Sequence, residues 1–220
     1  MESLRGPVGK KVVVAVTGFL MVLFVIAHML GNMTIFASQI NSYAEHLRSL
    51  PLLLWGYRAI MAAALLLHMI LGIRLALENL ASKSGNYFIT RHRSVTLAGE
   101  SMIWSGVLLL VFIVYHLLHF TFRVTNPGIS NSFDSLGRPD VGRMVILSFQ
   151  QGAIAVVYLA SMVLLYLHLS HGIQSMLQSV GLNGDESLPT VRRAGTVISL
   201  ILLAGFVVVP LCALFGFLHV

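Results

Sequence analysis

The sequence predicts an all-α integral membrane protein with five transmembrane helices, and two observations support this. Hydrophobic residues make up 57% of the 220 residues and charged residues only 10%, with a mean hydropathy of +0.87. Soluble domains carry about 25% charged residues, so lipid is the expected solvent. The length fits one domain spanning 1–220. Five apolar runs are long enough to cross about 30 Å of hydrocarbon, which takes about 20 helical residues. They lie near residues 12–36, 53–79, 97–122, 149–178 and 195–218.

The basic residues near the ends of these runs predict an orientation, because cytoplasmic loops carry an excess of Lys and Arg. Five lie on the side away from the N-terminus, and nine lie on its side: Arg5, Lys10, Lys11, Arg74, Lys83, Arg91, Arg93, Arg192 and Arg193. We therefore expect a multi-pass protein of the inner (cytoplasmic) membrane, with its N-terminus in the cytoplasm and its C-terminus outside.

The composition argues against several functions. The single cysteine, Cys212, allows neither a disulfide nor a cysteine-ligated iron–sulfur cluster within the chain. The three aspartates fall in loops, and the five glutamates form no acid–base or nucleophile constellation. The basic residues flank apolar runs instead of forming a stripe, so no nucleic-acid partner is expected.

Histidine is the residue in excess, and six of the nine lie inside the predicted spans. Ionisable groups in hydrocarbon are costly and usually mark function. One such histidine alone is more simply explained by a hydrogen bond to a neighbouring helix, but here four helices carry at least one. The six are His28, His68, His116, His119, His168 and His171.

Counting helix rise places four of these histidines at two levels. At 1.5 Å per residue, His28 lies roughly 24 Å above the cytoplasmic boundary and His116 at a similar level, while His68 and His168 lie roughly 16 Å above it. Two imidazoles at one level supply both axial ligands of a haem iron, which suits electron transfer. The sequence therefore predicts two b-type haems. His119 and His171 remain alternative ligands, because residues at i and i+3 share a helix face.

Glycines accompany the predicted ligands. His68 and His168 share the pattern H-x-x-x-G-I, which places Gly72 and Gly172 one turn away on the same face, where a macrocycle needs flat space. Gly18 and Gly106 lie ten residues before His28 and His116, which brings them to the inner level. Ordinary packing of small residues between helices is the simpler explanation of any one of them.

Three arginines lie near the ends of the spans: Arg58, Arg74 and Arg123. Each could pair with a haem propionate, or it could extend its charged end to the membrane interface without binding haem. A zinc site is disfavoured because each level offers two ligands and not three or four. A histidine proton relay of a transporter usually includes carboxylates at mid-depth, and this chain has none.

At these residues the chain resembles a known family, the single-chain, five-helix, dihaem cytochrome b subunit of succinate dehydrogenases and fumarate reductases (the b558-like group). The resemblance extends over nearly the whole chain. The stretches that carry it are Val25-Ile26-Ala27-His28, Asn41-Ser42-Tyr43-Ala44-Glu45 with Ser49-Leu50-Pro51, Leu67-His68 with Gly72, Val114-Tyr115-His116-Leu117-Leu118-His119-Phe120 and Leu167-His168-Leu169-Ser170-His171-Gly172. It implies that the axial ligands are His28, His68, His116 and His168.

The resemblance further implies an FAD-containing flavoprotein and an iron–sulfur subunit docked on the cytoplasmic face, with electrons passing between that subunit and a membrane quinone (menaquinone or ubiquinone). Dicarboxylate chemistry then belongs to the flavoprotein. The candidates for the quinone site are outer residues, where quinol oxidation needs a proton acceptor: Glu45, His46, Arg48 and His119. The alternative interpretation is that they belong to a solvated loop without a role in quinone binding. The competing functions are the dihaem cytochrome b of a nitrate reductase, formate dehydrogenase or hydrogenase, and a transporter without redox chemistry.

Overall fold

The structure, a computed structural model, describes residues 6–82, 102–179, 181 and 187–220. Across these residues every regular element is a helix, and the one isolated bridge joins Phe133 to Pro139. The long helices are α1 (Pro7–Met33), α3 (Pro51–Ser82), α5 (Met102–His116), α8 (Gly152–Ser179) and α9 (Leu188–Leu214). The short elements are the 3₁₀ turn η2 (Thr34–Ala37), α2 (Ile40–Arg48), the π-helical turn η3 (Leu117–Thr121), α6 (Pro127–Ser130) and α7 (Val141–Gln150).

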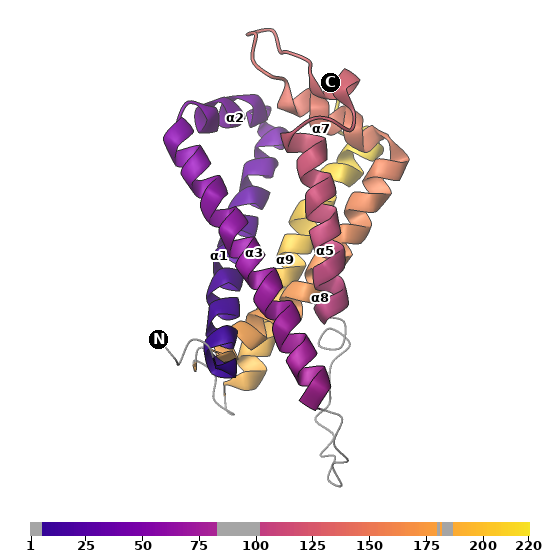
Figure 1. Ribbon diagram of the computed structural model, residues 1–220. Helices are drawn as coiled ribbons and strands as arrows, with labels where there is room; N and C mark the ends of the chain where they lie inside the picture. Colours follow the sequence, from indigo (N-terminus) through magenta and orange to yellow (C-terminus); the bar gives the residue numbers. More distant parts are fainter. Residues whose placement is uncertain (1–5, 83–101, 180, 182–186) are drawn as a thin grey trace.

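Five helical segments are long and apolar enough to cross a membrane, as predicted, and they run back and forth so that the two termini lie at opposite ends of the bundle (Figure 1). In hydrocarbon every backbone polar group needs an internal partner, so apolar segments of this length become helices. Many of their large apolar side chains are exposed, among them Leu52, Trp104 and Ile60, and these face the expected lipid. The spans are Val8–Ala37, Pro51–Asn79, Met102–Thr121, Gly152–Ser179 and Leu188–Leu214.

The predicted span boundaries were approximate, and several observed boundaries differ from them, by up to seven residues at the start of the fifth span. The fourth span begins at Gly152 and not at 149, because Gln151 is extended (φ −81°, ψ 106°) and separates α7 from α8. The fifth runs over Leu188–Leu214 instead of 195–218, since Pro189 suits the first helical turn and Gly216, with φ 75°, ends the helix. The predicted start of the third span, 97–101, lies outside the described residues, as do several of the counted basic residues: Arg5, Lys83, Arg91 and Arg93.

Two short helices that the sequence reading did not predict, α2 and α7, cover the end of the bundle where the C-terminus lies (Figure 1). Ile40 of α2 and Ile146 and Phe149 of α7 are buried in one apolar cluster with Tyr158 of α8 and Val209 of α9. The two helices therefore belong to the folded core at this end, which we call the outer end.

Hydrogen bonds tie α2 to the loop before α7. Asn41 Nδ2 donates to Asp140 Oδ1 (3.0 Å), and Asn41 Oδ1 accepts from the Gly142 backbone N–H (2.9 Å). Arg138 pairs with Asp134 (2.8 Å) and Glu45 (3.2 Å). Desolvation alone raises the pKa of Asp134, but hydrogen bonds from the Arg138 backbone and side chain outweigh it and hold that pKa below its usual value. The Asp134 carboxylate therefore stays ionised and keeps its ion pair with Arg138.

The helix packing leaves four helices around the bundle interior. α8 packs on α9, α5 and α1, whereas α3 packs chiefly on α1 and touches α5 only lightly. At the other end of the bundle, Lys10 of α1 pairs with Glu78 of α3. The interior between α1, α3, α5 and α8 receives the histidines.

Candidate functional site

The inner level of the bundle holds His68 of α3 beside His168 of α8. Their ring centroids lie 6.4 Å apart. Both side chains are partly buried and come from helices that run in the same direction, about 100 residues apart in sequence. The depth argument joined these two residues, and the structure places them side by side.

Each inner histidine is held by the helix next to it. His68 Nδ1 lies 3.1 Å from the Val14 carbonyl oxygen and 3.2 Å from Thr17 Oγ1, both on α1. His168 Nδ1 lies 3.1 Å from Ser105 Oγ on α5. Nδ1 is therefore engaged in both residues, which leaves Nε2 as the nitrogen for another partner.

Glycines on α1 and α5 receive these imidazoles. A Cβ added at Gly18 would lie 3.2 Å from His68 Cε1, and one added at Gly106 would lie 3.3 Å from His168 Cε1. The two glycines reach the inner level as predicted, but the space beside them is occupied by the histidine rings themselves. At Gly72 and Gly172 an added Cβ would meet no atom within 4 Å.

The outer level holds His28 of α1 beside His116 of α5, with ring centroids 5.8 Å apart and ring planes at 88°. Within the described part of the chain, no hydrogen bond is found for the ring nitrogens of either residue, in contrast to the inner pair. Aromatic rings surround the pair instead, with centroids 5.3 to 5.9 Å from one histidine or the other: Phe24, Phe112, Phe120, Tyr158 and Phe206.

His119 is directed elsewhere by the π-helical turn η3, which begins directly after His116. Its ring is fully buried, with Nδ1 3.0 Å from Tyr158 Oη on α8 and Nε2 3.1 Å from Ser148 Oγ on α7. In a regular α-helix residues three apart share a face, and both rings here contact Phe120 and Tyr158, but their other partners differ. His116 meets His28, whereas His119 ties together η3, α7 and α8 with both of its ring nitrogens.

The remaining candidates are dispersed. His171 lies on α8, about one turn beyond His168, and is partly buried. The Arg58 guanidinium lies 4.9 Å from the centre of the Trp55 ring, and Arg74 is exposed. Arg123 adopts a left-handed backbone conformation (φ 58°) and donates to the Ser130 carbonyl oxygen (3.1 Å); desolvation and nearby Arg48 lower its pKa.

Of the four quinone-site candidates, the structure groups three and separates one. Glu45, His46 and Arg48 lie on α2 and are exposed at the outer end. Glu45 accepts a hydrogen bond from Arg138 Nη1 (3.2 Å). His119 instead has Tyr158 and Ser148 as its partners.

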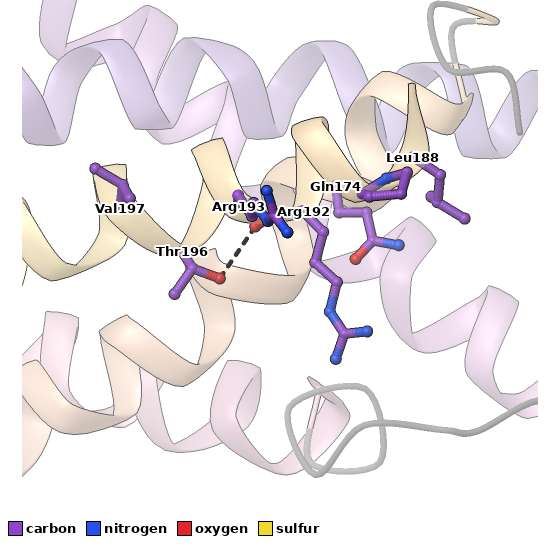
Figure 2. Close-up of a pocket in the computed structure, with 7 residues that line it drawn as sticks. Gln174, Leu188, Arg192, Arg193, Thr196 and Val197 are labelled. Carbon is purple, nitrogen blue, oxygen red and sulfur yellow. Dashed lines mark hydrogen bonds between the residues drawn. The ribbon is translucent and has the colours of Figure 1, made fainter. Parts of the chain in front are cut away.

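A groove of about 570 Å³ lies between α8 and the beginning of α9, and Figure 2 shows its lining. Thr196 Oγ1 donates to the Arg192 carbonyl oxygen there (3.0 Å). None of the residues predicted as site residues lines the groove. Its lining residues are Gln174, Leu188, Pro189, Arg192, Arg193, Thr196 and Val197.

The donors at each level fit an iron held between two imidazoles. Bonds of about 2 Å to each nitrogen, with about 1 Å more to each ring centre, set two ligand rings about 6 Å apart. The observed centroid separations are 5.8 and 6.4 Å. Among the described residues no group of three or more His, Cys, Asp and Glu side chains is arranged to hold a metal ion. Each level offers two imidazoles, the donor set that a bis-histidine haem would need.

Fold and site together define a polytopic helical membrane protein with two histidine pairs between four of its helices. Residues 100–209, half of the chain, match the family described as the succinate dehydrogenase/fumarate reductase transmembrane subunit, and the chain belongs to this family. No match was found among curated proteins or among solved structures. The matched half contains His116 and His168, while their neighbours His28 and His68 precede it.

Proposed function

We propose that this chain is the dihaem cytochrome b anchor of a succinate:quinone or fumarate reductase of the b558-like type. The observation that carries the proposal is the pair of matched histidine levels, His28 with His116 and His68 with His168, in a member of this membrane-subunit family. Two bound haems supply one-electron transfer across the membrane interior. The chain's part is to hold each iron from two opposite helices and to keep both sites free of water.

Family membership favours this function over the other respiratory complexes. Nitrate reductase, formate dehydrogenase and hydrogenase anchors also use histidine pairs, but the matched family is that of succinate dehydrogenase and fumarate reductase. As partners we propose an FAD-containing flavoprotein and an iron–sulfur subunit on the cytoplasmic face, which is the face of the N-terminus.

Reporters fused after Val220 and inserted at Lys83 test this orientation. We expect an extracytoplasmic signal after Val220 and a cytoplasmic signal at Lys83, and an extracytoplasmic signal at Lys83 would reverse the docking face.

The first test is purification of the complex in mild detergent. We expect two b-type haems per chain, a reduced-minus-oxidised band of b-type cytochrome, and copurification of the flavoprotein and the iron–sulfur subunit. A complex that carries a molybdenum or nickel enzyme instead would assign the chain to another respiratory system. A chain that purifies without any haem would contradict the cytochrome function.

For the quinone we propose a site at the outer end beside α2, with Glu45 as proton acceptor. Glu45 is exposed and paired with Arg138 through one hydrogen bond, so its carboxylate remains accessible. Arg48 and His46 flank it on the same helix. His119 is a weaker candidate, because it is fully buried and both ring nitrogens are already hydrogen-bonded.

Glu45→Gln tests this role. The change keeps the size of the side chain and removes the charge that accepts a proton, so we expect quinone-linked turnover to fall by about 10²-fold or more. Arg138 keeps its ion pair with Asp134, so the local structure at the outer end and the haem content should both remain unchanged. Succinate oxidation with an artificial acceptor is the control. Unchanged quinone kinetics would leave Glu45 as a solvated surface residue.

A further inference from the structure

The groove between the end of α8 and the beginning of α9 lies at the end of the bundle opposite the outer end, which we call the inner end (Figure 1). The apolar span of α9 begins there with Leu188 and continues to Leu214. Residues in the first turns of a span lie near the lipid headgroups, where hydrocarbon meets water. The groove, of about 570 Å³, therefore lies at the level of the headgroups.

The polar side of the groove carries two positive charges and no negative one. Arg192 and Arg193 line it, and both are exposed. Among the described residues no acidic side chain lines the groove, and none forms an ion pair with either arginine. An uncompensated positive charge of this kind raises the local concentration of anions. The electrostatics of the groove therefore favour an anionic ligand.

Gln174 supplies a further polar group from α8. Its side chain is partly buried and extends in the same direction as that of Arg192 in Figure 2. An amide N–H and a guanidinium both donate to anionic oxygens, and a guanidinium can donate two parallel hydrogen bonds to one phosphate. The Thr196 hydroxyl already donates to the Arg192 carbonyl oxygen (3.0 Å), so its proton is not available to a ligand. Donors from two helices thus border the groove.

The apolar side of the groove continues onto the lipid-facing surface of α9. Val197 lines the groove and is 54% exposed, and Ile201, one turn further along the same helix face, is 58% exposed. Both lie within the span, so hydrocarbon chains are expected to contact them. A ligand with an anionic group at one end and a hydrocarbon chain at the other matches both parts of this surface, whereas a free anion matches only the first.

We propose that this groove binds an anionic phospholipid, with its phosphate against the two arginines and Gln174 and one acyl chain along Val197 and Ile201. Basic pockets between transmembrane helices recognise the headgroups of such lipids. The simpler interpretation is that the two arginines only set the orientation of the chain, which requires no preference among lipids. The site involves neither the histidine pairs nor the quinone-site candidates, so it goes beyond the proposed function.

The test is a competition between two lipids for the purified complex in mild detergent. Anionic phosphatidylglycerol and zwitterionic phosphatidylcholine are added in equal amounts, and the lipids that stay bound are counted by native mass spectrometry. We expect the parent to retain phosphatidylglycerol in preference. Arg192→Gln and Arg193→Gln should each lower the ratio of bound phosphatidylglycerol to phosphatidylcholine by about fivefold, the effect of one basic residue at an anionic surface. The double variant should lose most of the preference.

Two further variants and one added anion serve as controls. Lys11→Gln removes an exposed charge from α1 at the same end of the bundle but outside the groove, and it should keep the parent ratio. Arg192→Lys keeps the charge and should keep most of the preference. Inorganic phosphate in excess should not displace the bound phosphatidylglycerol, because it has no chain to contact the apolar side.

The outcomes distinguish a lipid from other occupants. Equal retention of the two lipids by the parent, or an equal loss of preference in Lys11→Gln and Arg192→Gln, would overturn the inference. Displacement by inorganic phosphate would also overturn it and would indicate a simple anion site. If the double variant lost its partner subunits and kept the parent lipid ratio, a protein and not a lipid would occupy the groove. A parent complex without haem would refute the proposed function and leave this inference standing.

Discussion

Alanine at His68 or His168 is expected to remove one haem of the two, and alanine at His28 or His116 the other. A haem that loses one axial bond keeps the other imidazole and its contacts with the helices, but one imidazole alone cannot hold the iron in its low-spin state. The haem-to-protein ratio should fall from two to one in each variant. The spectra should group pairwise, with one shared defect for the inner pair and a different one for the outer pair.

The pairing is what makes this result specific. Succinate should still reduce the remaining haem of the outer variants, whereas the inner variants should need a chemical reductant. His171→Ala is the matched control on α8, and it should retain both haems. If His28→Ala shared its defect with His68→Ala instead of His116→Ala, the assignment of pairs to levels would be wrong. Two haems in all four variants would rule out these four histidines as the haem ligands.

The second large effect is expected at His119, on stability and not on haem content. His119→Ala leaves the buried Ser148 and Tyr158 without their shared partner. Each buried polar group left unpaired costs about 1–3 kcal/mol. We expect the purified variant to unfold at a clearly lower temperature than the parent and to bind both haems below that temperature.

Tyr158→Phe is the graded comparison for His119→Ala. It removes one of the two hydrogen bonds and keeps the ring that packs between Phe112 and Phe149, so its unfolding temperature should lie between those of the parent and His119→Ala. Loss of the outer haem from His119→Ala, together with its retention in His116→Ala, would exchange the roles of the two histidines.

The sequence predicted the five spans and the neighbours within each histidine pair because helix rise is nearly constant. Counting residues along a straight helix gives depth, and depth was enough to join His68 with His168 and His28 with His116. The haem ligation of these residues stays a proposal. The contacts of Thr17 and Ser105 with the inner histidines could also have been predicted, since each residue precedes the glycine that lies ten residues before an outer histidine.

Other features depend on contacts that local pattern does not encode. α2 and α7 are 9 and 10 residues long, too short to be stable alone, and they gain stability by burying Ile40, Ile146 and Phe149. The π-helical turn after His116 changes the helix register without a distinctive residue. His119 therefore looked like an equivalent ligand, because its partners lie 29 and 39 residues further along the chain.

Each outer histidine lies on the same helix as a glycine that contacts an inner histidine. α1 carries Gly18 and His28, and α5 carries Gly106 and His116, in each case ten residues apart within one unbroken helix. The levels are therefore separated by about 15 Å of continuous backbone. Small movements of the helices relative to one another shift the inner and outer levels together. The distance between the two levels cannot change unless helix hydrogen bonds break. The length of these two stretches is therefore constrained, since deleting one residue would rotate everything beyond it by about 100°.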